Sequence, residues 1–374
     1  MKTPRCSSRR SFVRNFSLGA AALALAPRGR AQPASAASAA PRKLGIALVG
    51  LGGYATGQLA PALKLTQHVE LRGVVTGTRS KGQQWAQNFG FPEKNIYDYG
   101  TMARLADNPD IDIVYVVTPN ALHPEHTIAA AWAGKHVISE KPMATTVADC
   151  DAMLAACRVN KVKLSIGYRL HFDPFHLEMK RLAREKDFGA LTKMTGSNGF
   201  RMGRKIWRAE RKLAGGGPLM DMGVYCVQAA CMIAEEAMPI AVTAREHPKT
   251  RPEIFADVEE GIDWTMEFAN GAKAELASSY NENTGRFRAE SDKGWVNLDP
   301  GFGYRGIRAS TSKGPMPMAE VLSQQALQLD DFAQCVREGR ESPVSGAMGR
   351  RDMVIIEAIY KSAAQGGKRI EVVV

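Results

Sequence analysis

Two short stretches of this sequence carry residue types that could bind a nucleotide and move a proton. The first is the turn Gly50-Leu51-Gly52-Gly53-Tyr54-Ala55, which fits the pattern G-x-G-x-x-A between an apolar strand and a helix. Glycines at these positions let the pyrophosphate of a dinucleotide approach the start of the helix. The second is Glu140-Lys141-Pro142, which follows the apolar segment His136-Val137-Ile138. Together they predict a nicotinamide enzyme with a cationic residue at the site of hydride transfer.

The segment after the second apolar strand indicates which dinucleotide binds. An acidic side chain there would accept hydrogen bonds from the ribose 2′-hydroxyl group and would repel a 2′-phosphate. The sequence instead reads Thr76-Gly77-Thr78-Arg79-Ser80-Lys81, with hydroxyl groups, a guanidinium and an ammonium but no carboxylate. Such a group can hold a phosphate through charge-assisted hydrogen bonds, so we expect NADP. The alternative is a solvated, basic start of a helix.

Short apolar segments alternate with segments of helical length from Leu44 to Gly167. We expect strands at 44–50, 69–76, 111–118, 137–139 and 163–167, and helices at 54–65, 81–89, 126–133 and 147–160. Continuous apolar strands that alternate with helices indicate a parallel sheet covered on both faces. Residues 44–168 are therefore predicted to form a doubly wound Rossmann domain of the α/β class.

After about residue 169 the pattern changes to longer, alternating strands. These are expected at 192–201, 241–247, 262–268, 272–280, 286–290 and 295–298, with tight turns at Asn270-Gly271 and Asp292-Lys293-Gly294. Helices are expected at 219–234, 320–338 and 350–364, the last two packing back on the first domain. Residues 169–374 are thus predicted to form an α+β domain whose large, mostly antiparallel sheet leaves one face open for packing between subunits.

The first residues of the chain have the features of an export signal. Ser8-Arg9-Arg10-Ser11-Phe12-Val13 is typical of the twin-arginine route, and the apolar run 16–26 that follows is too short to span a bilayer. We expect 1–31 to be a removable signal and 32–43, rich in Ala, Pro and Ser, to be an arm or linker. Because this route exports folded proteins, we expect a periplasmic enzyme that is loaded with its cofactor before export and has no stable membrane insertion.

Composition limits the remaining classes of function. Removing the seven basic residues of 1–31 from the formal net charge of +11 leaves +4, which gives little support for nucleic-acid binding. The cysteines beyond the signal are odd in number, and a protein folded in the cytoplasm should keep them as buried thiols. The close histidine pairs have no carboxylate cluster beside them, so no metal site is predicted.

The motifs resemble those of the Gfo/Idh/MocA family, and specifically its glucose–fructose oxidoreductase branch. Besides the two stretches above, the resemblance rests on Ile96-Tyr97-Asp98-Tyr99, Pro119-Asn120-Ala121-Leu122-His123, Gly167-Tyr168-Arg169 and the run from Ala214 to Tyr225. It implies tightly held NADP that shuttles hydride between two sugars by a ping-pong route. Lys141 and Tyr225 match the catalytic pair, and Asp221 lies one helical turn before Tyr225. The residues expected to contact the nucleotide are Gly50, Leu51, Gly52, Gly53, Tyr54, Ala55, Thr76, Thr78, Arg79, Lys81, Tyr99, Thr118, Pro119, Asn120, His123, Glu140, Lys141, Arg169, Trp207, Arg208 and Tyr304.

The chemistry of the proposed pair can be argued from the side chains. Oxidation of a sugar at C1 removes a proton from its hydroxyl group, and a tyrosine is a poor base at its reference pKa of about 10. A neighbouring ammonium favours the phenolate, and in the reverse direction Lys141 can polarise a carbonyl. Asp221 and Tyr225 would share one face of a helix, although Asp221 could instead be a favourable charge at a helix start. His123 could contact the cofactor or cap the helix that follows it.

Other functions are compatible with the same motifs. A conventional NADP-dependent sugar dehydrogenase would release its cofactor at each turnover, and some exported relatives use the nucleotide while hydrolysing a glycosidic bond. A non-catalytic sugar sensor would need neither Lys141 nor Tyr225. The arm is shorter than in the glucose–fructose enzyme, so the resemblance does not decide between a dimer and a tetramer. The segment 200–209 is also shorter, so the resemblance does not identify the acceptor sugar.

Overall fold

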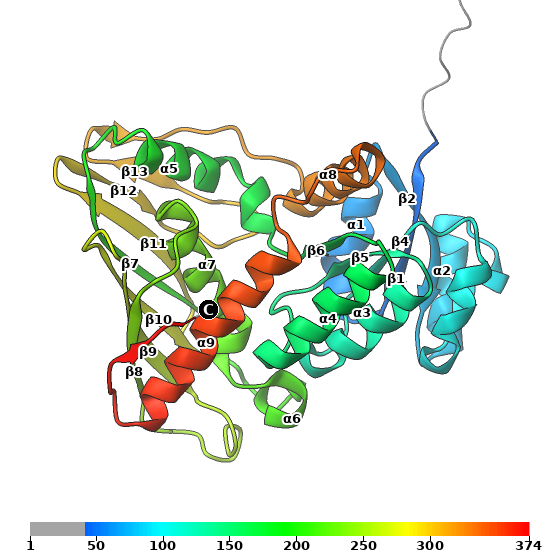
Figure 1. Ribbon diagram of the computed structural model, residues 1–374, viewed down its shortest axis with the longest axis horizontal. Coiled ribbons are helices and arrows are strands. Elements are labelled where there is room, and N and C mark those ends of the chain that lie inside the picture. Colours follow the sequence, from blue (N-terminus) through cyan, green and yellow to red (C-terminus); the bar gives the residue numbers. More distant parts are fainter. Residues whose placement is uncertain (1–41, 374) are drawn as a thin grey trace, which may run out of the picture. The chain divides into compact units, whose positions relative to one another are not determined.

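The computed structural model describes residues 42–373 (Figure 1). The expected export signal at 1–31 and the arm up to residue 41 lie outside the described residues. From Arg42 onward the chain forms one compact unit that contains two β-sheets. Among the described residues, no helix combines the length and apolar character needed to cross a bilayer.

The first sheet has six parallel strands in the order β3-β2-β1-β4-β5-β6. This is the doubly wound order in which the chain reverses direction across the sheet between β1 and β4, so that a crevice forms at their carboxyl ends. Every residue of β1 and β4 is buried, which explains their continuous apolar sequences. The strands are β1 Leu44–Val49, β2 Val69–Val75, β3 Ile96–Tyr97, β4 Ile113–Val116, β5 His136–Ser139 and β6 Leu164–Ile166.

The helices of this half largely follow the predicted alternation. They are α1 Ala60–Leu63, α2 Arg79–Phe89, α3 His123–Trp132 and α4 Val147–Val159. The single helix predicted at 54–65 is wrong in detail, since it begins with a π-helical turn, Ala55–Leu59, in which Ala60 N donates to Ala55 O. Pro61 has no amide hydrogen to donate, and this weakens the regular α-helical ladder at that point.

The second sheet has nine strands in the order β14-β13-β12-β11-β7-β10-β9-β8-β15. Of its described pairs, β7 and β10 run parallel and the others run antiparallel, so the mostly antiparallel sheet is confirmed. Both predicted tight turns join antiparallel neighbours, β9 to β10 and β11 to β12. The strands are β7 Leu191–Gly199, β8 Ala241–Glu246, β9 Gly261–Glu267, β10 Lys273–Ser279, β11 Thr284–Ser291, β12 Gly294–Leu298, β13 Ala309–Thr311, β14 Gly314–Pro315 and β15 Ile370–Glu371.

The helices after β6 cover one face of the second sheet or pack against the first half of the molecule. They are α5 Pro174–Arg184, α6 Arg211–Ala214, α7 Val224–Ile233, α8 Gln324–Glu338 and α9 Gly346–Ala364. Figure 1 shows α8 beside α1 and β2, and its Leu329 and Phe332 belong to the core of the first sheet. The continuous α-helix predicted at 219–234 is wrong, because a π-helical turn, Leu219–Gly223, precedes α7.

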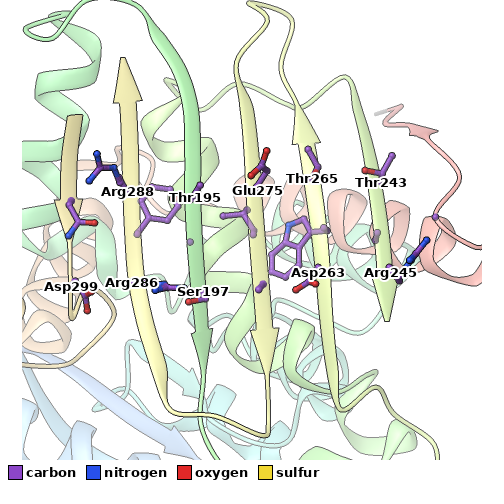
Figure 2. A pocket seen from close by; sticks show the side chains of 18 of the residues that line it. Thr195, Ser197, Thr243, Arg245, Asp263, Thr265, Glu275, Arg286, Arg288 and Asp299 are labelled. Carbon is purple, nitrogen blue, oxygen red and sulfur yellow. The ribbon is translucent and has the colours of Figure 1, made fainter. Parts of the chain in front are cut away.

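No helix of residues 42–373 covers the opposite face of the second sheet, which forms a depression of about 710 Å³ (Figure 2). Polar and charged side chains of both signs stand on it at every second position of the strands, as on a sheet face that is not part of the core. They include Arg245, Asp263, Glu275, Arg286 and Arg288.

Candidate active site

Most of the predicted catalytic and nicotinamide-end residues line one cavity of about 300 Å³ between the first sheet and the second. Loops at the carboxyl ends of β1, β4 and β5 supply one side of the cavity. The turn before α7 and the segments around residues 207 and 303 supply the other. The lining residues are Tyr54, Val117, Thr118, Asn120, His123, Glu140, Lys141, Arg169, Phe200, Trp207, Arg208, Asp221, Met222, Tyr225, Phe302, Gly303 and Tyr304.

The glycine turn after β1 has the geometry of a dinucleotide cradle. Gly50 has a φ of +96°, and a Cβ atom there would lie 2.9 Å from the carbonyl oxygen of Val117, so only glycine fits. A Cβ atom on Gly52 or Gly53 would meet no protein atom within 4 Å, which leaves space for a ligand against the backbone. Ala55 is fully buried against the strands. The turn therefore fits a nucleotide whose pyrophosphate rests on this backbone.

The segment after β2 is less basic in the folded protein than its sequence indicates, because a carboxylate lies beside one of its two cations. Thr76 is buried, and its hydroxyl oxygen accepts a hydrogen bond from the amide of Thr78 at 3.2 Å. The guanidinium of Arg79 lies 3.5 Å from the carboxylate of Glu93, a partner that the sequence did not indicate. Lys81 is exposed and makes no ion pair among the described residues. The predicted cation pair is thus one free ammonium and one guanidinium that a carboxylate partly neutralises.

Tyr99 stands near this segment from the chain after β3. Its ring stacks on His126, with the ring centroids 5.0 Å apart, and a Cβ atom on Gly77 would lie 3.5 Å from it. The ring is half-exposed, so one of its edges is available to a ligand at the end of β2. The position suits the predicted contact of Tyr99 with the nucleotide.

Lys141 and Asp221 meet across the cavity. The Nζ atom of Lys141 donates to the main-chain carbonyl oxygen of Asp221 at 2.6 Å and lies 3.4 Å from its Oδ1 atom. The other carboxylate oxygen of Asp221 lies 2.9 Å from Nε of Arg208 and accepts from the Tyr280 hydroxyl at 3.2 Å. Burial opposes the charge of this carboxylate, yet Lys141 and Arg208 hold the pKa of Asp221 below its ordinary value. Asp221 is therefore an ionised partner of both cations.

Tyr225 is nearly buried and lies between two cations. Nζ of Lys141 is 4.5 Å from the centroid of its ring. Nε of Arg169 donates to its hydroxyl oxygen at 3.3 Å, and the Arg169 guanidinium is 4.9 Å from the same ring. The structure thus brings together the three residues predicted to be catalytic. They share the cavity even though a π-helical turn, and not a regular α-helix, spaces Asp221 from Tyr225.

Glu140 anchors the segment that carries Lys141. It is buried, and its carboxylate accepts from the Tyr115 hydroxyl at 2.6 Å and from the amide of Lys141 at 3.2 Å. Burial raises the pKa of Glu140, while Tyr115 and Lys141 oppose the rise. A Cβ atom on Gly167 would lie 2.7 Å from this carboxylate, so glycine makes room for it. These contacts fix the backbone from which the Lys141 side chain enters the cavity.

Two other predicted contacts of the nucleotide already have protein partners. The amide of Asn120 donates to the carbonyl oxygen of Ala214 at 2.9 Å. The two ring nitrogens of His123 each lie 2.9 Å from a carbonyl oxygen, one of Pro142 and one of Thr118. His123 is the first residue of α3 and its side chain does not cap that helix, so the capping alternative is wrong. Both residues line the cavity, and their hydrogen bonds join the chain segments on either side of them.

Sequence reasoning did not find several residues of the site. Met222 and Phe302 line the cavity, and Gln324 holds Arg169 from outside it. Glycines flank Phe302 in the sequence, which indicates a turn close to a ligand. Met222 carries no such signal, because its place depends on how the two sheets meet. Trp207 and Arg208, which were predicted, line the cavity with the guanidinium 4.5 Å from the indole centroid.

A dinucleotide cradle beside a cavity that holds a lysine–tyrosine pair defines a nucleotide-dependent oxidoreductase. Residues 44–168 match the oxidoreductase family with an NAD-binding Rossmann fold, and residues 176–297 match the GFO/IDH/MocA C-terminal domain. The chain belongs to the Gfo/Idh/MocA family of oxidoreductases, as the sequence motifs predicted.

Particular relatives are similar over most of the chain. The crystal structure of aldose-aldose oxidoreductase from Caulobacter crescentus, complexed with glycerol, has 42% sequence identity and a TM-score of 0.85, covering 88% of this chain and 100% of that one. D-xylose 1-dehydrogenase [NADP(+)] of Haloarcula marismortui is 27% identical over 328 residues, which are 85% of this chain and 90% of that protein. Levoglucosan dehydrogenase of Pseudarthrobacter phenanthrenivorans is 25% identical over 75% of this chain and 84% of its own length.

Proposed function

We propose that this protein is a sugar oxidoreductase that oxidises an aldose at C1 to the aldonolactone and passes the hydride to the carbonyl of a second sugar, an aldose or a ketose. The observation that carries the proposal is the position of Tyr225 beside two cations, with its hydroxyl in the same cavity as Lys141 and Asp221. The similarity to an aldose-aldose oxidoreductase at 42% identity supports a sugar as substrate.

The side chains of the cavity have distinct tasks in this reaction. Tyr225 accepts the proton of the C1 hydroxyl group when the donor sugar is oxidised and returns it when the acceptor is reduced. Lys141 polarises the carbonyl oxygen of the acceptor, and Asp221 holds the ammonium in place through its carbonyl oxygen and carboxylate. The bound nicotinamide nucleotide supplies the hydride acceptor and donor. Trp207 and Phe200 offer apolar surface against which a sugar ring can pack.

The cofactor in this proposal is tightly bound NADP. The acid-free segment Thr76-Gly77-Thr78-Arg79-Ser80-Lys81 supports a 2′-phosphate, with Lys81 exposed and unpaired among the described residues. One of the dehydrogenases to which the chain is similar carries NADP(+) in its name. Retention of the nucleotide follows from the proposed export through the twin-arginine route, since an exported enzyme cannot exchange its cofactor with the cytoplasmic pool.

The periplasmic location and the oligomer belong to the same proposal. The twin-arginine pattern at Ser8–Val13 supports export of the folded, loaded enzyme. The open face of the second sheet carries side chains of both signs, among them Arg286, Arg288, Asp263 and Glu275, which suits a two-fold contact with a second copy. Light scattering of wild type and of Arg286→Glu tests this interface, because a like-charge contact should shift a dimer or tetramer toward the monomer.

The decisive experiment for the reaction omits added nucleotide. Purified protein should show the absorbance of bound NADPH after one sugar is added, and a second sugar should remove it. With two sugars and no free NADP, lactone and a reduced sugar should accumulate together, with parallel lines in double-reciprocal plots. Nucleotide released by denaturation should be NADP by mass spectrometry.

A conventional NADP-dependent sugar dehydrogenase is the second candidate, favoured by the similarity to a D-xylose 1-dehydrogenase over 85% of the chain. In that case activity appears only when NADP is added and scales with its concentration. Purified protein would then carry no nucleotide, and a single sugar would be converted in full at the expense of the added cofactor. Release of a free sugar from an aryl glycoside would instead indicate a glycosidase.

A further inference from the structure

All three guanidinium nitrogens of Arg169 donate hydrogen bonds to other residues. Arg169 follows β6 as the first residue of a 3₁₀ turn, Arg169–Phe172, and is 3% exposed. Its NH1 atom donates to Oε1 of Gln324 at 2.6 Å and to the carbonyl oxygen of Gly303 at 3.1 Å, and NH2 donates to the carbonyl oxygen of Phe302 at 2.6 Å. Its Nε atom donates to the hydroxyl oxygen of Tyr225 at 3.3 Å.

The guanidinium has no carboxylate partner within ion-pair distance among the described residues 42–373. The carboxylate of Asp173 is reached only through Gln324, whose Nε2 atom donates to it at 2.8 Å. Asp173 is itself bound to the buried ring of His176 at 2.8 Å. A buried cation that lacks an anion is costly, so a group beside it is expected to carry the compensating negative charge. The groups in direct contact are carbonyl oxygens, an amide oxygen and the phenol of Tyr225.

The rings of two tyrosines enclose the guanidinium. Its central carbon lies 4.9 Å from the ring centroid of Tyr225 and 4.4 Å from that of Tyr304. Burial opposes the charge, but the neighbouring Tyr225 and Tyr304 hydroxyls raise the pKa of Arg169 above its ordinary value. Arg169 therefore stays charged at every pH at which the enzyme would work.

Lys141, the other cation beside Tyr225, is paired with an acidic residue. Its ammonium donates to the carbonyl oxygen of Asp221 and shares the carboxylate of that residue with Arg208. Much of its field at Tyr225 is thus cancelled by an ionised neighbour, and the ammonium lies over the ring and has no hydrogen bond to the hydroxyl among those described. The cation that contacts the phenolic oxygen directly is Arg169.

We infer that Arg169 is a positioning residue that turns the hydroxyl of Tyr225 toward the cavity and stabilises its phenolate form. The inference rests on the proposed function in taking Tyr225 as the base. Because a guanidinium only donates, the Tyr225 oxygen accepts from Arg169, and its own hydrogen must point elsewhere. A direct hydrogen bond from a charged donor favours the ionised phenol over the neutral one.

Other charged and titratable groups also face Tyr225. The Lys141 ammonium faces it from the loop after β5, and Asp221 and Glu140 line the same cavity. Tyr54 and Tyr304 also line the cavity, and the Tyr304 ring stacks on Arg169. The two carboxylates disfavour the phenolate, whereas the Lys141 ammonium and the Arg208 guanidinium, which also lines the cavity, favour it. A contribution from Arg169 must therefore be measured by removing it with these groups left in place.

The test is an ultraviolet difference titration of tyrosinate that needs no turnover. Subtracting the spectrum of Tyr225→Phe from that of the wild-type holoenzyme isolates the ionisation of Tyr225. The same difference is taken between Arg169→Met and the double variant Arg169→Met/Tyr225→Phe. Removal of the charge should move the midpoint upward by one pH unit or more, which is roughly a tenfold or larger loss of proton release. Arg169→Lys keeps the charge and should restore part of the shift.

Controls separate this role from a structural one. Arg305→Met removes an exposed guanidinium from the same loop as Tyr304 and should leave the midpoint unchanged. Should Arg169→Met not fold, Arg169→Gln removes the charge but keeps a polar side chain that can donate to Gly303. An unchanged midpoint in the neutral variants overturns the inference.

The activity profile tests the inference separately from the proposed function. The acidic limb of kcat/KM for sugar oxidation, on which activity rises as the base loses its proton, should move to higher pH in Arg169→Gln and should move back in part in Arg169→Lys. If the wild type oxidises no sugar, the proposed function fails, while the tyrosinate titration still decides the role of Arg169. If the wild type oxidises sugars and the titration midpoint does not depend on Arg169, only the inference fails.

Discussion

The ammonium nitrogen of Lys141 lies 2.6 Å from the main-chain carbonyl oxygen of Asp221 and 3.4 Å from its carboxylate. Lys141 follows β5 of the first sheet, whereas Asp221 belongs to the π-helical turn that precedes α7. The contact therefore joins the carboxyl end of β5 to the turn that leads into α7, the helix that carries Tyr225. The place of the ammonium over the Tyr225 ring depends on this same contact.

Replacement of Lys141 by alanine should abolish most of the turnover and leave the nucleotide in place. The side chain is largely buried between Asp221 and Tyr225, and loss of one group that polarises or transfers protons typically lowers a rate by about 10²–10⁴. The single-turnover rate of nucleotide reduction by a sugar measures the effect, and mass spectrometry counts the bound nucleotide. Lys313→Ala, an exposed lysine on the turn between β13 and β14, is the matched control. Equal rates in the two variants would remove Lys141 from the chemistry.

Tyr225→Phe should lose hydride transfer while keeping the architecture of the cavity. The ring remains between Lys141 and Arg169, so only the hydroxyl oxygen and its contact with Arg169 are lost. Removal of a general acid–base group is expected to lower both half-reactions by about 10²–10⁴. Separate measurement of the oxidation of one sugar and the reduction of another checks this. Near-normal turnover in either direction would show that another group carries the proton.

Thr76→Asp should reverse the preference for the phosphorylated nucleotide. Thr76 is buried at the end of β2, where its oxygen accepts from the amide of Thr78, and a carboxylate there would repel a 2′-phosphate. The ratio of NADP to NAD affinity should fall by at least about tenfold, or ~1.4 kcal/mol. Thr76→Ser keeps the hydroxyl group and should behave as wild type. If the wild type is purified with NAD and the aspartate changes nothing, the assignment of NADP is wrong.

The architecture could be predicted from the sequence because the pattern of apolar residues along each strand and helix reflects which of its faces are buried. Every residue of β1 and β4 is buried, and such strands are apolar throughout, which the sequence displays directly. The helix α5 was missed although its signal is present, since Asp173 caps it and Pro174 occupies its first position. The short strands β13 to β15 could not be predicted, because pairing with distant neighbours and not their composition makes them strands.

The site was predictable where a motif fixes the backbone and unpredictable where the tertiary structure selects the partner. Gly50 and Lys141 belong to local motifs. Lys141 lines the cavity, and the turn that begins at Gly50 contributes Tyr54 to it. The contact of Arg79 with Glu93 and that of Arg169 with Tyr225 join segments whose approach follows from the packing of whole elements. The π-helical turn at Leu219–Gly223 could not be predicted from the sequence, because the four-residue spacing of Asp221 and Tyr225 is the same as in a regular α-helix.

Glu259 should control both the stability of the protein and the position of Asp221. Its buried carboxylate accepts from the amides of Gly217 at 2.8 Å and Leu219 at 3.2 Å, where the π-helical turn begins, and from the Tyr360 hydroxyl at 2.7 Å. In Glu259→Gln one acceptor oxygen becomes a donor, so the free energy of unfolding should fall by about 1–3 kcal/mol and kcat should fall with it.

Urea unfolding and steady-state kinetics of Glu259→Gln measure the two effects. Tyr360→Phe removes only the hydroxyl contact, so it should lower the stability less and leave kcat close to that of wild type. A Glu259→Gln protein with unchanged kcat would mean that the turn keeps its geometry without the carboxylate.

His171 should make the fold less stable in mild acid. Burial lowers the pKa of His171 to about 4, against an ordinary value near 6.5, and its Nε2 atom has no hydrogen-bond partner among the described residues. As pH falls from about 6.5 toward 4, the unfolded chain binds a proton at this site while the folded protein does not, so the free energy of unfolding decreases across this window, by up to about 3 kcal/mol. Below pH 4 the contribution should level off. His171→Asn should therefore show a flatter dependence of Tm on pH between 6.5 and 4 than wild type. Parallel curves for wild type and His171→Asn would show that His171 is protonated as readily in the folded state as in the unfolded chain.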